Sequence, residues 1–370
     1  MAQTQAQHTA MNLNGSANST LSARPPRSTG CHMTLDDDTR IGLTVAYVFV
    51  FITAITANSL VIHVVRTQKK MKVSFNFLVV NMAVADTVDA LFAIPLNIAY
   101  LYAENQWFSG FLGIIVCKIT RMMVLVAILV SIATLSVITV ERYLATTQVL
   151  KRPLTLTSVK RLIAAIWVIS GLAAVNEAVK HHVTFTRGAW RCMPIITKDW
   201  QRQFMIEFII KFMVTYAVPL LTMAILYSII VCLLWKRKTL GEQIDENDRR
   251  VQIQRRSVIQ KLVIIVSLFA VCWLPVHVNH FLGTFDRKAY ICLPQWVVLG
   301  FYWLAHANTA INPLIYLMLT KHSRALFKSS ITGKRNGSMD KNRNHTRKTT
   351  LFGSWKRGSR KSRSLTKAGM

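Results

Sequence analysis

The chain lacks several features of soluble and secreted proteins. Charged residues make up only 16% of its 370 residues, whereas hydrophobic residues make up 52% and the mean hydropathy is +0.33. This composition excludes an ordinary soluble domain. The first 40 residues contain no apolar run, so no cleavable signal peptide is visible and the first apolar segment must direct its own insertion. No cysteine follows Cys292, which excludes palmitoylation of the C-terminal tail.

Acidic residues are also scarce: 16 Asp and Glu stand against 45 Lys and Arg, and the formal net charge is +29. Fifteen basic residues lie from Lys321 onward, where Asp340 is the one acid. Few aromatic residues separate these charges, which disfavours nucleic-acid binding. We expect the tail to lie against anionic lipid, and the alternative is a solvated, disordered tail.

The chain is instead rich in long apolar segments, seven of which are long enough to cross a bilayer as helices. They cover 41–65, 76–102, 113–140, 159–179, 204–234, 258–283 and 293–319. A single block could be a buried core helix, but seven in series predict an all-α membrane protein with a seven-transmembrane helix bundle. The predicted domains are a tail at 1–40, the bundle at 41–320, an amphipathic eighth helix at 321–331 and a basic disordered tail at 332–370.

The distribution of Lys and Arg predicts the orientation of the bundle. Basic residues are concentrated in the loops after the first, third and fifth spans and in the C-terminal tail, so these segments are expected to be cytoplasmic. The N-terminal tail is then extracellular, and Asn14 and Asn18 begin glycosylation sequons in it. The outer loop 180–202 is basic too, which we interpret as a property of the ligand site.

Two cysteines on the outer side predict a disulfide. Cys117 lies at the outer start of the third span and Cys192 in the outer loop before the fifth, and both face an oxidising compartment. Closing a loop of this length stabilises a fold by about 4–5 kcal/mol in the chain-entropy model. Cys31 and Cys292 are also expected outside and could form a second disulfide.

Polar residues inside the spans are functional candidates because they are costly in hydrocarbon. One carboxylate among neutral oxygen donors suits a small hard cation such as Na⁺, or a proton. The alternative is a hydrogen-bond network that only joins helices. The set comprises Asn58, Asp86, Ser131, Asn308 and Asn312.

A series of landmark residues lies at particular places in the spans and in the outer loops between them. It comprises Leu78, Ala85-Asp86, Trp107, Cys117 with Cys192, Glu141-Arg142-Tyr143, Trp167, Pro219 with Tyr227, Phe269, Cys272-Trp273-Leu274-Pro275 and Asn312-Pro313-Leu314-Ile315-Tyr316. Across about 41–330 this series resembles the rhodopsin-like (class A) G protein-coupled receptors. The resemblance implies a receptor that activates heterotrimeric G proteins, with no enzymatic activity and no cofactor beyond an allosteric Na⁺ at the polar set.

The resemblance also implies roles for individual residues. Glu141 would hold Arg142 at rest, and Tyr143, Tyr227, Asn312, Pro313 and Tyr316 would complete the switch that meets the G protein. Ile132, Pro219, Phe269, Trp273 and Pro275 would connect the ligand pocket to this switch. Kinases and arrestin are the expected partners of the tail.

The expected ligand class depends on which family residues are replaced in the outer half of the bundle and on which polar residues are found there. Val124 replaces the aspartate of amine receptors and His306 the lysine of opsins, so neither class is expected. The mixed-charge mouth that remains resembles that of neuropeptide receptors, and the alternative is a receptor for a lipid or small acidic molecule. The predicted ligand-binding residues are Asn97, Arg121, Val124, Lys180, Glu207, Lys211, Trp273, Asn279, His280, Trp303 and His306.

A transporter or proton-linked channel is the alternative from another class. Buried Asp86 and the helix-bending prolines Pro95, Pro219, Pro275 and Pro313 would suit it. We disfavour it because the chain has no inverted repeat and no second acid within the membrane to partner Asp86.

Overall fold

The computed structural model describes residues 35–67, 74–103, 106–147, 155–186, 188–195, 199–239 and 246–317. The sequons at Asn14 and Asn18, the cysteine Cys31, the amphipathic segment 321–331 and the basic tail 332–370 lie outside these ranges. The expectations attached to them therefore stay predictions.

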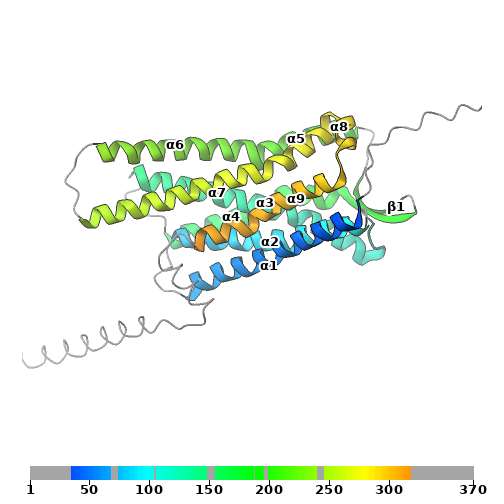
Figure 1. Ribbon diagram of the computed structural model, residues 1–370, viewed down its shortest axis with the longest axis horizontal. Coiled ribbons are helices and arrows are strands. Elements are labelled where there is room, and N and C mark those ends of the chain that lie inside the picture. The colour runs from blue at the N-terminus through cyan, green and yellow to red at the C-terminus, as the bar shows by residue number, and fades with distance from the viewer. Residues whose placement is uncertain are drawn as a thin grey trace, which may run out of the picture.

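Each of the seven predicted spans contains helix within the described residues, and the helices lie side by side in one bundle (Figure 1). Figure 1 shows the β-hairpin and α8 at one end of the bundle, here named the hairpin end. The opposite end, which holds the C-terminal part of α3, is named the Arg142 end. The elements are α1 (Asp37–Thr67), α2 (Ser74–Ala103), α3 (Gly110–Thr147), α4 (Leu156–Lys180), β1 (His181–Thr186), β2 (Ala189–Pro194), α5 (Trp200–Phe212), the π-helical turn η2 (Met213–Ala217), α6 (Val218–Thr239), α7 (Glu246–Phe285), α8 (Arg287–Cys292) and α9 (Gln295–Leu317).

Within the described ranges, six helical segments are long and apolar enough to cross a membrane. The segment that runs from α5 through η2 into α6 counts as one of them. The predicted seventh span, α9, is not among the six although it has 23 residues. Its buried residues include His306, Asn308 and Asn312, which lower its hydropathy because their polar side chains face the bundle interior.

Two helix ends differ from the sequence prediction. α1 begins at Asp37, inside the predicted tail, because Asp36 accepts a hydrogen bond from the backbone N–H of Thr39 at 3.0 Å and so caps the helix. α3 extends beyond the predicted end of the third span at residue 140 and continues to Thr147. The Thr146 hydroxyl donates to the backbone carbonyl of Arg142, one turn earlier, at 2.8 Å. The polar side chain of Thr146 is therefore hydrogen-bonded within its own helix.

The bend predicted at Pro219 is a π-helical turn. η2 lies directly before α6, whose second residue is Pro219. π-Turns inside α-helices are frequently found at functional sites. The Tyr216 hydroxyl of η2 donates to the backbone carbonyl of Ala270 in α7 at 2.8 Å, so the turn is tied to the neighbouring helix. Pro95, Pro275 and Pro313 lie inside α2, α7 and α9.

The outer loop before the fifth span, for which no strand was predicted, contains a β-hairpin. β1 and β2 pair antiparallel, with Val183 opposite Cys192, and Gly188 in the turn has a φ of +75°. The predicted disulfide between Cys117 and Cys192 is confirmed and fixes the hairpin to the start of α3. Cys292 is also disulfide-bonded, but its pairing with Cys31 stays a prediction.

Candidate functional site

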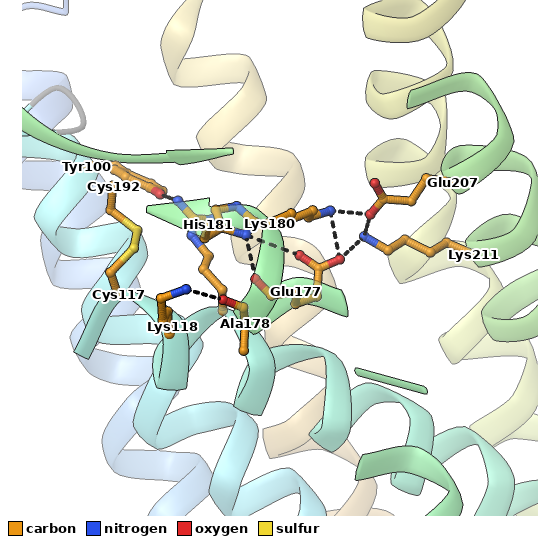
Figure 2. Close-up of polar contacts among 11 residues, drawn as sticks. Tyr100, Cys117, Lys118, Glu177, Ala178, Lys180, His181, Cys192, Glu207 and Lys211 are labelled. Atoms are coloured by element: carbon orange, nitrogen blue, oxygen red, sulfur yellow. Dashed lines mark hydrogen bonds and ion pairs between the residues drawn. A yellow bond between two sulfur atoms is a disulfide. The ribbon is translucent and has the colours of Figure 1, made fainter. Parts of the chain in front are cut away.

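Two lysines and two glutamates at the hairpin end form a closed ring of ion pairs, here named the quartet (Figure 2). Lys180 contacts Glu177 at 2.9 Å and also contacts Glu207. Lys211 contacts the same two carboxylates. The Glu177 side chain, at the centre, is only 8% exposed. Each lysine therefore has two acidic partners, the four charges cancel, and the quartet joins the end of α4 to α5.

The quartet changes the meaning of the predicted ligand residues. Lys180, Glu207 and Lys211 lie together, as residues of one ligand site should, yet each is paired with another protein side chain. The basic character of the outer loop therefore does not come from Lys180, because its charge is neutralised. Glu177, which completes the quartet, was not among the predicted ligand-binding residues.

His181, which follows Lys180, adds no charge at neutral pH. Its Nδ1 lies 2.9 Å from the backbone carbonyl oxygen of Glu177, so Nδ1 carries the proton and donates. Burial lowers the pKa of His181 to about 4, although the Glu177 backbone contact and carboxylate oppose the shift. The imidazole is consequently neutral, and the quartet remains balanced.

Arg121 differs from the quartet lysines in lacking a carboxylate partner. One guanidinium nitrogen donates to the Tyr100 hydroxyl, and the guanidinium carbon lies 5.5 Å from the centre of the Tyr100 ring. Its Nε is buried without a hydrogen-bond partner. Among the residues described, none of the ion pairs found involves Arg121.

Further polar groups of α7 and α9 lie at the same end. Asn279 is 2% exposed and its Oδ1 has no hydrogen-bond partner, and the indole N–H of Trp303 is likewise buried and unpartnered. His280 Nε2 lies 2.9 Å from the Tyr302 hydroxyl. Buried polar atoms without partners are rare in proteins, so these atoms offer hydrogen bonds to a ligand.

Two other predicted ligand residues are less available. Asn97 of α2 is buried, and its Nδ2 donates to the Ala93 carbonyl at 2.8 Å, within its own helix. Val124 is half-buried on α3, about one turn beyond Arg121. Neither residue supplies a free charge to the mouth, so both would act through shape and packing.

Deeper in the bundle His306 pairs with an acid that the sequence analysis overlooked. Its Nδ1 lies 2.7 Å from Oδ2 of Asp89, and both side chains are at most 5% exposed. The ring of Trp273 lies 5.9 Å from the His306 ring. The expectation of a single acid among the spans was wrong: Asp89 follows Asp86 by three residues, on nearly the same face of α2. One argument against a transporter is thereby removed.

Two of the residues predicted to hold a cation with Asp86 contact its carboxylate. Ser131 donates to Asp86 Oδ1 at 3.0 Å, and Asn312 Nδ2 donates to Oδ2 at 3.2 Å. The Oδ1 atoms of Asn58, Asn308 and Asn312 are buried and have no hydrogen-bond partner. One carboxylate and several unpartnered amide oxygens fit the donor set that a small hard cation requires.

Two of the predicted connector residues, Phe269 and Trp273, form an aromatic path together with Tyr216. Ile132, Phe269 and Trp273 share one buried cluster. The ring centres of Tyr216 and Phe269 are 6.4 Å apart, and those of Phe269 and Trp273 are 5.9 Å apart. The path runs from the π-turn before Pro219 to Trp273, two residues before Pro275, so a shift at Trp273 can reach both bent helices.

At the Arg142 end the charged pair is closed. Arg142 Nε lies 2.5 Å from Glu141 Oε2, and the guanidinium carbon lies 4.4 Å from the ring centre of Phe75. Tyr227 accepts a hydrogen bond from Thr139 at 3.1 Å.

The other predicted switch residues lie nearby with partners of their own. The Tyr316 hydroxyl donates to Asn76 Oδ1 at 2.8 Å. Tyr143 packs against the main hydrophobic cluster. Pro313 is buried inside α9, directly after Asn312. Arg142 is therefore held by Glu141 and Phe75, and neither Tyr227 nor Tyr316 hydrogen-bonds to it.

Comparison with known proteins assigns this architecture to a family. The family model described as 7 transmembrane receptor (rhodopsin family) matches residues 57–316, which is most of the chain. The chain belongs to this rhodopsin family of seven-transmembrane receptors. The match includes α9, so this helix is the seventh of the family bundle although its hydropathy is lower than that of the other six segments.

Individual relatives cover most of the receptor. It is 30% identical to the Substance-K receptor of Homo sapiens over 286 residues, which are 76% of this chain and 71% of that protein. The Substance-K receptor of Mus musculus is 30% identical over 285 residues, 76% of this chain and 73% of that protein. The Neuromedin-K receptor of Rattus norvegicus is 31% identical over 294 residues, 78% of this chain and 63% of that protein.

Proposed function

We propose that this receptor binds an extracellular peptide and in response activates heterotrimeric G proteins. The observation that carries the proposal is the identity of about 30%, over three quarters of the chain, with receptors named for substance K and neuromedin K. The polar groups at the hairpin end support it, because the unpartnered side-chain oxygen of Asn279 and the indole N–H of Trp303 can hydrogen-bond to the amides of a peptide. A lipid or small acidic ligand is the alternative that the experiment below tests.

The proposed mechanism links the two ends of the bundle. An agonist must bind the active packing more tightly than the resting one, since a ligand shifts an equilibrium only through differential affinity. The aromatic path through Trp273 and Phe269 would transmit the shift to α6 and α7. Arg142 would then leave Glu141 for the G protein. By linkage, G protein and agonist raise each other's affinity by the same factor.

The remaining parts of the proposal concern orientation and partners. The receptor is placed in the plasma membrane with its N-terminus outside, as the basic loops and tail favour. Asn58, Asp86, Ser131, Asn308 and Asn312 would hold Na⁺, which would supply a positive charge to the buried carboxylate. Asn14 and Asn18 would be glycosylated, and the Ser- and Lys-rich tail would meet kinases and arrestin.

The test is nucleotide exchange on a mixed G protein panel, with membranes that contain the receptor. Synthetic substance K, synthetic neuromedin K and fractions of a source-tissue extract are added before and after protease treatment. Protease-sensitive stimulation supports the peptide proposal, and Arg142→Ala membranes should not respond. Stimulation that survives protease and partitions into organic solvent would replace the peptide with a lipid.

A further inference from the structure

We propose that the ligand presents a carboxylate to Arg121, and that Tyr100 and Asn279 help to bind it. This inference deepens the proposed function and rests on it for the peptide nature of the ligand. It concerns a different property, namely the charge of the group that enters the mouth. A peptide with a free C-terminal carboxylate is the ligand class that this site favours.

The charge balance at the hairpin end carries the first step. The quartet contains two lysines and two glutamates and sums to zero, and His181 is neutral. Asp89 is occupied by His306. Lys118, one turn before Arg121, donates to the backbone carbonyl of Ala178 at 2.8 Å and so faces α4. Arg121 is thus a cation of the mouth that has no carboxylate partner among the described residues, and it faces Tyr100 of α2 rather than α4.

The surroundings of Arg121 carry the second step. Residues from α2, α4, β1 and α9 lie around it: Tyr100 by a hydrogen bond, and Glu177, His181 and Tyr302 within electrostatic range. Glu177 is already shared between the two lysines of the quartet. A guanidinium removed from water without a counter-ion is costly in free energy, so an anionic ligand group would gain more here than at the quartet.

The hydrogen-bond inventory carries the third step. A guanidinium has five N–H donors in a planar fork, which matches the two oxygens of a carboxylate. The unpartnered Nε of Arg121 and a neighbouring N–H can donate to such a pair. The Tyr100 hydroxyl accepts from Arg121 and retains its own proton for the carboxylate. Asn279 hydrogen-bonds to Tyr302, and its free Oδ1 can accept the amide N–H next to a peptide's terminal carboxylate.

The probes are pairs of N-acetyl amino acids, each used as the free acid and as the primary amide at millimolar concentration. The readout is the melting temperature of the purified receptor. Ligands that bind only the folded state raise it, and we expect the best acids to raise it by about 2–4 °C while their amides do not. Arg121→Gln should remove the shift, and Arg121→Lys should restore part of it because the charge returns.

Lys118→Gln is the matched control, because it removes a cation one turn away on the same helix but changes no residue of the proposed site. It should keep the acid-selective shift. Equal shifts with acids and amides, an unchanged shift in Arg121→Gln, or no shift with any acid would overturn the inference. The melting curve without probe shows for each variant that the protein is folded. Failure of the peptide proposal would appear only in the nucleotide-exchange assay, so the two failures are distinguishable.

Discussion

The two ends of the bundle use ion pairs in opposite ways. At the hairpin end the quartet connects α4 with α5, and each charge has two partners. At the Arg142 end the pair lies between neighbours in one helix, Glu141 and Arg142. Releasing the first requires helices to separate, whereas releasing the second requires only side-chain rotation. The comparison teaches that a charge pair ties a structure together or serves as a switch depending on whether its partners share an element.

The largest expected effect comes from removing the switch. Arg142→Ala should reduce agonist-stimulated nucleotide exchange to background, because the group proposed to meet the G protein is gone. Surface expression should stay within about twofold, since both partners of the ion pair lie in α3 and the pair does not join two helices. Arg66→Ala, which removes another cation at the same end, is the control and should signal. An undiminished response in Arg142→Ala would disprove the assigned role.

Breaking the quartet should act on stability instead. Glu177→Gln leaves two lysines sharing one glutamate, and breaking a buried ion pair costs about 3–5 kcal/mol. We expect the melting temperature of the purified receptor to fall by several degrees. Asp37→Asn, which breaks the exposed pair with Arg40, should change it by less than a degree. Equal effects of the two substitutions would contradict the contrast between the quartet and exposed pairs.

An effect of intermediate size is expected between the two ends. Asp86→Asn should abolish the dependence of agonist affinity on Na⁺, which in wild type should be about fivefold or more. Radioligand competition with Na⁺ or a large organic cation measures it. Asp89→Asn, which alters the other buried acid of α2, should keep the dependence. A sodium effect that persists in Asp86→Asn would reject the site.

The smallest effect concerns pH at the hairpin end. His181 titrates at about 4 in the fold and near 6.5 when unfolded, so between these values the unfolded state binds more protons. The free energy of unfolding should therefore fall as the pH drops below 6.5, by about 1 kcal/mol at pH 5.5. Melting curves from pH 7 to 5.5 should be flatter for His181→Asn. A wild-type slope that the substitution leaves unchanged would exclude this histidine as its source.

Much of the fold could be predicted because membrane insertion depends on local hydropathy. Segment length and apolarity predicted the bundle, and one carboxylate among amides on two spans and a hydroxyl on a third predicted the set around Asp86. The hairpin was not predicted, because two short strands resemble a polar loop until the disulfide from Cys192 fixes them. The sequence analysis predicted α9 as an apolar span, although its buried polar side chains lower its hydropathy.

Most residues of the candidate site were predicted, but the ion pairs between them were not. Lys180, Glu207 and Lys211 were all named, yet their neutrality depends on Glu177, which lies 30 residues before Glu207 and on another element. Such pairing is a property of how α4 meets α5, which no local pattern encodes. Asp89 was different, because it was visible in the sequence and was missed.

The closed quartet has a consequence for the rate of ligand entry. Lys180 ends α4 and is followed directly by β1, so displacing the hairpin also moves one corner of the ring. Since every lysine has two acidic partners, two contacts must break together before that corner is free. We therefore expect the quartet to slow any movement of the hairpin away from α5, and with it any exchange of ligand that requires this movement.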